Sequence, residues 1–187
     1  MGSGTRRALT RTRISLLLPL SVAMESACEL LDFEVVDGTP TETLPALLTE
    51  KMPEGIKILE AYEAVRKVKE IAWLRVRGVL EYDRCSDTAE IAGKLGAFFG
   101  QQSILVTKLT KKKEETQVDI APLIREIVFV ADGPHKVRME TVVAAQNPGL
   151  NPSLLLEALR QSTPALSPDF ACFARVEVYD QAMGVFR

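Results

Sequence analysis

The order of strand-like and helix-like patterns along the chain predicts an α+β fold. From about residue 71 the pattern reads strand, helix, strand, strand, helix, strand, whereas residues 14–62 read only strand, strand, helix, strand. The longer series is the βαββαβ order of a ferredoxin-like fold, and the shorter one is the same order without its opening strand and helix. We therefore predict tandem ferredoxin-like halves, of which the first is truncated.

Composition divides the chain into three parts. Residues 1–12 contain Gly, Ser, Thr and Arg without apolar periodicity, so they are predicted to form a flexible arm. The charged run 63–70 is the best linker candidate. We therefore assign residues 13–66 to the partial ferredoxin-like half and residues 67–187 to a ferredoxin-like domain with an extra hairpin.

The elements of the first half follow from short local patterns. Residues 14–18 are continuously apolar, which predicts a central strand covered on both faces. Residues 31–35 alternate apolar and charged side chains, as in a strand with one dry face. Residues 39–42 have the form of a capping box and open a helix that ends before Pro53. The stretch 56–62 then reads as a further strand.

The second half has stronger patterns. Residues 71–82 form a long strand with one apolar and one polar face, and Ser86 or Asp87 caps the helix that follows. That helix carries an apolar stripe that includes Phe98, and Gly100 ends it. The remaining predicted elements are strands over 103–109, 116–120, 127–130, 137–145 and 171–179, and a helix from Asn151 through Leu159.

Composition excludes several classes of function. A net charge of −2 gives no overall attraction to nucleic acid or membranes, so any such binding must come from a local patch. The cysteines stand singly at Cys28, Cys85 and Cys172, which is typical of reduced thiols in a cytoplasm and supplies no cluster for an iron–sulfur site. We therefore predict a cytoplasmic protein with no metal, cofactor or membrane partner.

The start of the chain also has an alternative interpretation as a secretory signal. Arginines between Arg6 and Arg13 precede the apolar run 14–24, which resembles a basic segment followed by a short apolar segment. However, Glu25 stands in the cleavage zone, where small or apolar residues are expected, and the run is too short to span a bilayer. We favour a buried strand pair, and a secreted domain, or one anchored by lipid at Cys28, stays as the alternative.

Few residues are candidates for catalysis. A single histidine, His135, excludes zinc sites that need paired histidines and argues against a triad base. The glycine-rich phosphate-binding motifs and the nucleophile-elbow motif are absent from the sequence. Asp119 is the one weak candidate for a carboxylate base, and a role in capping the short turn after Pro122 is favoured over it.

A lysine-rich hairpin tip is the main candidate for binding. Such a tip can contact phosphates with salt-dependent, sequence-independent affinity. Glu114 and Glu115 follow the lysines directly and neutralise much of their field, so a solvated turn is the alternative interpretation. The candidate RNA- or partner-binding residues are Lys108, Lys111, Lys112, Lys113 and Arg125.

The long strand offers a second, weaker candidate for RNA binding. Trp73 and Tyr82 are the aromatic residues near the basic positions Arg75 and Arg77 of that strand. Aromatic rings can stack on bases, and neighbouring guanidinium groups can add to the attraction. This composition indicates a possible stacking platform.

Three stretches of the sequence carry a resemblance to a known family. They are residues 13–22 with Glu29, residues 47–58 with Met-Pro-Glu-Gly, and residues 110–124 with Val-Asp-Ile-Ala-Pro-Leu-Ile. These stretches resemble the radical-SAM-linked family, a bacterial domain of unknown function that occurs alone or joined to B12-binding radical-SAM proteins. The resemblance extends over residues 13–180 and implies a radical-SAM protein or an RNA-modification system as the partner.

The chain also departs from that family. The family has an upstream Ser-His-Leu-Asp motif and an arginine-rich helix, neither of which occurs here, so we expect a chain truncated at its N-terminus. Ala23 stands where the family has a glycine, and Ala121 stands where a basic residue is common. The chain has no CxxxCxxC motif either, so it is not itself a radical enzyme.

Together these observations predict a non-catalytic accessory or binding module that works with radical-SAM-type or RNA-modification systems. An enzyme acting on RNA or a nucleotide is one alternative, and it would depend on Asp119. A secreted or lipid-anchored domain is the other. Turnover by an Asp119→Asn variant separates the first alternative from a binding module, and the mass of the mature N-terminus separates the second.

The truncation predicts self-association. A half that lacks its first strand and helix leaves an apolar sheet face uncovered, built from Leu16, Leu18, Leu31 or Phe33. Exposed apolar patches drive association, so we predict a homodimer or poor solubility, measured by sedimentation at several concentrations. A monomer that melts cooperatively would contradict the truncation argument.

Overall fold

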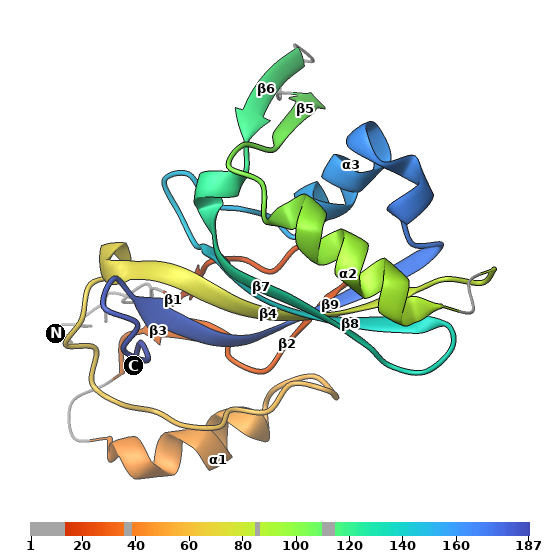
Figure 1. Cartoon of the computed structure of the whole chain (residues 1–187). Helices are drawn as coiled ribbons and strands as arrows, with labels where there is room; N and C mark the ends of the chain where they lie inside the picture. The colour runs from red at the N-terminus through yellow and green to blue at the C-terminus, as the bar shows by residue number, and fades with distance from the viewer. Residues whose placement is uncertain (1–13, 36–38, 85–86, 110–114) are drawn as a thin grey trace, which may run out of the picture. The chain divides into compact units, whose positions relative to one another are not determined.

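The computed structural model describes residues 14–35, 39–84, 87–109 and 115–187 (Figure 1). The contacts divide the chain into two units. Of the described residues, unit 1 contains 14–18, 29–35, 39–67 and Arg187, and unit 2 contains 19–28 and most of the chain from Val68 to Phe186.

A five-stranded sheet with the order β2-β9-β4-β8-β7 forms the centre of unit 2. The central strand β4 pairs antiparallel with β8 on one side and with β9 on the other. β7 pairs antiparallel with β8, and β2 pairs parallel with β9. The strands are β2 (Met24–Ser26), β4 (Ile71–Glu81), β7 (Ile124–Ala131), β8 (Lys136–Ala144) and β9 (Phe170–Asp180).

Two helices lie on the same side of this sheet (Figure 1). Helix α2 (Thr88–Phe99) follows β4, and helix α3 (Ser153–Ser162) connects β8 to β9. A hairpin of β5 (Leu105–Leu109) and β6 (Glu115–Asp119) is inserted between α2 and β7. Unit 2 therefore follows the βαββαβ order with an inserted hairpin, and the predicted α+β class is confirmed.

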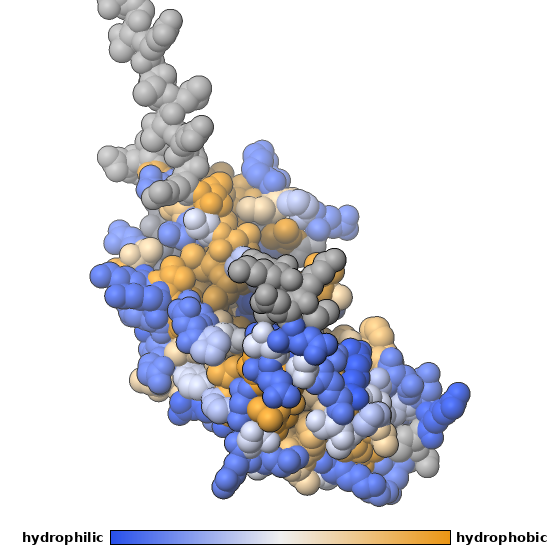
Figure 2. All heavy atoms as spheres, turned by 90° about the horizontal axis from the view of Figure 1, so that it is seen from above, coloured by the Kyte–Doolittle hydropathy of each residue, from blue (hydrophilic) through white to orange (hydrophobic). Residues whose placement is uncertain are grey.

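The core of unit 2 lies between the sheet and the helices. Leu74 and Leu80 of β4 are buried on the helix side, and so are Leu95 and Phe99 of α2. The ring of Phe99 stacks on that of Phe129 in β7 with centroids 5.6 Å apart. Seen from above, the surface carries hydrophilic residues mixed with hydrophobic ones, as is normal for folded proteins (Figure 2).

Local capping explains where α2 begins and ends. The Asp87 carboxylate accepts a hydrogen bond from the backbone N–H of Glu90 at 2.9 Å, and Gly100 is the C-cap residue. This N-cap bond satisfies one of the donors that a helix start leaves unpaired. Both helix boundaries agree with the sequence prediction, and Ser86 lies outside the described residues.

Unit 1 differs from its prediction. Among the described residues, β1 (Ile14–Leu17) pairs only with β3 (Leu30–Phe33), in a two-stranded antiparallel sheet, and α1 spans Leu44–Thr49. The prediction of a central strand covered on both faces is wrong, since the side chains of Ile14 and Leu16 are 64% and 55% exposed. An apolar run does not tell how many neighbours its strand will have.

The strand predicted over residues 56–62 is also wrong. These residues have no regular secondary structure, and Leu59 is 70% exposed. A stretch rich in apolar residues forms a strand only where a neighbouring strand accepts its backbone hydrogen bonds, and no such neighbour lies among the described residues. The described part of unit 1 has no βαββαβ series, so the tandem arrangement is not confirmed.

Strand β2 was not predicted from the sequence. β2 has three residues, Met24–Ser26, too few for a period-2 pattern, and it joins the sheet of unit 2. The turn before it holds Ala23 at φ 64°, in the left-handed region. None of the helices in the described parts of the chain is long and apolar enough to cross a membrane.

The packing of α2 leads to a stability prediction. Phe98 is 9% exposed, so Phe98→Ala should lower the free energy of unfolding by about 3–5 kcal/mol through lost burial and a cavity. Gly93 of the same helix has open space at its Cβ position, so Gly93→Ala should instead raise it by about 1 kcal/mol. Denaturant melts measure both, and a loss below about 1 kcal/mol for Phe98→Ala would mean that the buried helix face is wrong.

The turn before β2 leads to a second stability prediction. A left-handed conformation costs a residue with a Cβ about 1–2 kcal/mol. Ala23→Gly should therefore raise the free energy of unfolding by about 1 kcal/mol, measured in the same melts. Ala27→Gly is the matched control, because Ala27 has no positive φ and should gain nothing. Equal effects at both positions would rule out backbone strain at Ala23.

Candidate functional site

The face of the unit 2 sheet opposite α2 and α3, called here the helix-free face, collects aromatic and charged side chains. Side chains at paired strand positions share a face. Trp73 of β4 pairs with Tyr179 of β9, and Arg77 pairs with Glu140 of β8. Arg75, two residues from each, completes a group that comes from three adjacent strands.

A guanidinium group lies over each of the two rings. The Arg75 guanidinium carbon is 5.6 Å from the centroid of the Tyr179 ring. The Arg125 guanidinium carbon is 5.4 Å from the centroid of the Trp73 ring. Both distances lie within the range of cation–π attraction. Arg125 belongs to β7, where the pairing with β8 shifts between Ile124 and Glu126.

Glu140 fixes two of the arginines. Its carboxylate oxygens contact Arg75 Nη1 at 2.7 Å and Arg77 Nε at 3.2 Å. Partial burial acts to raise the pKa of Glu140, but the hydrogen bonds and charges of Arg77 and Arg75 outweigh burial and hold this pKa below its usual value. Glu140 therefore stays ionised at neutral pH and holds the two guanidinium groups in place.

Two donors on this face lack acceptors. The Trp73 indole Nε1 and the Arg75 Nε are buried and have no hydrogen-bond partner among the described residues. Buried N–H groups are nearly always paired, so each unpaired one calls for an explanation.

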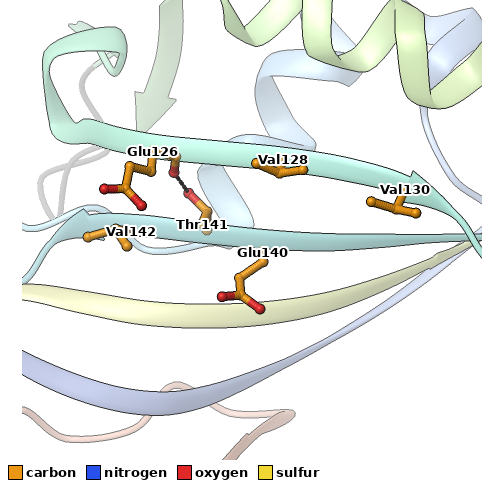
Figure 3. A pocket seen from close by; sticks show the side chains of 6 residues that line it. All are labelled: Glu126, Val128, Val130, Glu140, Thr141 and Val142. Carbon is orange, nitrogen blue, oxygen red and sulfur yellow. Dashed lines mark hydrogen bonds between the residues drawn. The ribbon is translucent and has the colours of Figure 1, made fainter.

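A shallow hollow lies next to this group on the same face (Figure 3). Its volume is about 320 Å³. The hydroxyl of Thr141, a residue that also borders the hollow, donates to the carbonyl oxygen of Glu126 at 2.7 Å. The hollow is lined by Glu126, Val128, Val130, Glu140, Thr141 and Val142.

The residues nominated from sequence are distributed over different elements. Lys108 lies in β5 opposite Thr116, whereas Arg125 lies in β7 of the five-stranded sheet. Lys111, Lys112 and Lys113 lie outside the described residues. The two described members of the candidate binding set, Lys108 and Arg125, therefore lie in different sheets.

The Asp119 carboxylate is held by backbone hydrogen bonds at the base of the β5–β6 hairpin. Its carboxylate accepts hydrogen bonds from the backbone N–H groups of Ile104 at 2.9 Å and Ala121 at 3.1 Å. The N–H of Ile104, the Ser103 hydroxyl and the N–H of Ala121 lower the pKa of Asp119 below its usual value. The carboxylate joins the two ends of the hairpin, and its lowered pKa makes it a weaker base.

The stacking platform has a different second member from the one nominated. Tyr82 is 5% exposed and donates to the carbonyl oxygen of Leu166 at 3.1 Å, so its ring is not part of the helix-free face. Tyr179 stands beside Trp73 instead. The sequence predicted a strand over 171–179, but the pairing of two strands about 100 residues apart is not encoded in either strand alone.

Within the described residues, no group of three His, Cys, Asp or Glu side chains could hold a metal ion.

Comparison with known proteins shows the family of the chain. No curated protein and no solved structure gave a significant match. A family model described as an uncharacterized protein conserved in bacteria, DUF2344, matches residues 10–152, which is well over half of the 187 residues. The chain therefore belongs to this bacterial protein family.

Proposed function

We propose that this protein is a non-catalytic, cytoplasmic module that binds single-stranded RNA on the helix-free face. The observation that carries the proposal is the pair Trp73 and Tyr179, in register on neighbouring strands, with a guanidinium group over each ring. Unstacked bases bind by stacking on aromatic rings and on arginine planes.

The charges around the rings favour stacking over phosphate attraction as the main source of affinity. Arg75, Arg77 and Arg125 supply three positive charges, and the carboxylates Glu126 of β7, Glu140 of β8 and Glu177 of β9 oppose them. A face with nearly balanced charge releases few counterions when it binds a phosphate backbone. We therefore expect a shallow dependence of affinity on salt, with a slope of log affinity against log salt of about −1 to −2.

The resemblance to the radical-SAM-linked family supports a role for this module alongside an RNA-modification system. In this proposal the module holds an RNA strand while a radical-SAM-type partner modifies it. The alternative of an enzyme acting on RNA has less support. Its candidate base, Asp119, has a lowered pKa and accepts hydrogen bonds from two backbone N–H groups.

The single tryptophan provides a direct test. Trp73 is the only tryptophan of the chain, so its fluorescence reports on this face alone. Titration with a mixed-sequence single-stranded RNA of twelve nucleotides at low salt should quench that fluorescence, because a base stacks against the indole. Tyr179→Ala should weaken binding by about 1–3 kcal/mol, the usual contribution of one stacked base.

The matched control is Tyr82→Phe, which changes a tyrosine on the helix side and should leave affinity unchanged. Fluorescence anisotropy of labelled RNA extends the test to Trp73→Ala. An absence of quenching and of anisotropy change at low ionic strength would remove the RNA proposal and leave a protein partner. Equal losses in Tyr179→Ala and Tyr82→Phe would place the RNA elsewhere.

A further inference from the structure

The two edges of the unit 2 sheet are unequal. At one edge β2 has three residues, and at the other β7 has eight. An edge strand exposes unpaired N–H and C=O groups, and proteins usually protect it with short length, charges, proline or bulges. β7 has such protection only at its start, where Arg125 and Glu126 lie at the pairing shift. Residues 127–131 carry no charge, no proline and no glycine.

The two faces of β7 are anchored differently. On the helix side Phe129 stacks on Phe99, which holds the strand beneath α2. On the helix-free face Val128 and Val130 are 57% and 50% exposed, and both border the hollow (Figure 3). β7 is therefore a firmly held strand with an exposed apolar row along its unpaired edge.

We propose that β7 is a docking edge for an extended segment of a protein partner, which adds to the sheet as a further strand. Strand addition of this kind takes its affinity from backbone hydrogen bonds and its specificity from alternate side chains. An antiparallel segment would place apolar side chains opposite Val130 and Val128 and, two residues further on, a basic side chain opposite Glu126.

Charge complementarity supports the basic position. Glu126 is exposed, and within the described part of the chain it has no ion-pair partner. The other carboxylate of the hollow, Glu140, is already bound by Arg75 and Arg77. A lysine or arginine of the added strand would pair with Glu126 directly across the strands, where opposite charges stabilise and like charges destabilise.

A second copy of the chain fits this edge less well. In an antiparallel pairing of β7 with itself, the residues that border the hollow are Glu126, Val128 and Val130. The register that pairs Val128 with its own copy sets Glu126 opposite Val130. The registers shifted toward Glu126 set this residue opposite Val128 or its own copy, so none of these three registers places a positive side chain directly opposite the carboxylate. A partner segment with a basic residue opposite Glu126 supplies the positive charge that these registers do not.

The test uses the full chain and two probe peptides that differ at one position. The first is an acetylated, amidated peptide of sequence Thr-Val-Thr-Val-Thr-Lys-Thr carrying a fluorophore, and the second has Glu in place of Lys. Anisotropy titration should show up to about fivefold tighter binding of the Lys peptide, since a cross-strand charge pair contributes up to about 1 kcal/mol. Hydrogen exchange should slow at residues 127–131 when the Lys peptide binds.

Two variants make the test specific. Glu126→Lys should reverse the preference to the Glu peptide, and Val130→Lys should weaken both peptides. Equal binding of the two peptides, or a preference that Glu126→Lys leaves unchanged, would overturn the proposal. Sedimentation that shows a dimer lost in Val130→Lys would also overturn it, in favour of a second copy. Unchanged exchange in β7 with the Lys peptide at millimolar concentration would overturn it as well.

Discussion

The pairing of β4 on both of its edges is the constraint on which the rest of unit 2 depends. β4 is hydrogen-bonded to β8 over nine positions and to β9 along nearly its whole length. Because successive side chains alternate, this one strand supplies both the buried row with Leu74 and Leu80 and the row with Trp73, Arg75 and Arg77. A shift of β4 by one residue would exchange the two rows, so the core and the candidate site depend on the same register.

The same strand shows how tightly the sheet is fitted. Gly78 lies opposite Phe173, and a Cβ at this position would be 2.9 Å from two atoms of the Phe173 ring. The aromatic ring fills the space that the missing side chain leaves, which fixes the pairing of β4 with β9 at this position. The pairing shifts by one residue between Arg75 and Val76, and beyond this shift Tyr179 lies opposite Trp73. The geometry of the aromatic pair thus depends on this irregular pairing as well as on the close contact at Gly78.

The ion pairs of the helix-free face contribute more to orientation than to stability. The side chains of Arg75, Arg77 and Glu140 are 33%, 65% and 42% exposed, and ion pairs this accessible contribute at most about 1 kcal/mol. Their effect is to limit the rotamers of the two arginines. A face whose guanidinium groups are already oriented loses less side-chain entropy when a ligand binds.

The sequence predicted best what depends on neighbours along the chain. Three features were predicted correctly because each depends on a local pattern: the alternation of β4, the cap at Asp87 and the end of α2 at Gly100. The partner of Trp73 was not, because Tyr179 is brought to it only by folding. Local apolarity was also misleading at residues 14–18 and 56–62, since it does not tell whether a second layer or a neighbouring strand will be present.

The position of β2 has a consequence for any attempt to divide this protein. The chain leaves unit 1 after Leu18, contributes β2 to the sheet of unit 2, and returns to unit 1 at Glu29. The two units are therefore interleaved along the chain, not arranged in succession. A fragment that begins at Val68 would lack β2 and leave one edge of β9 unpaired, so unit 2 is not encoded by a single continuous stretch of the gene.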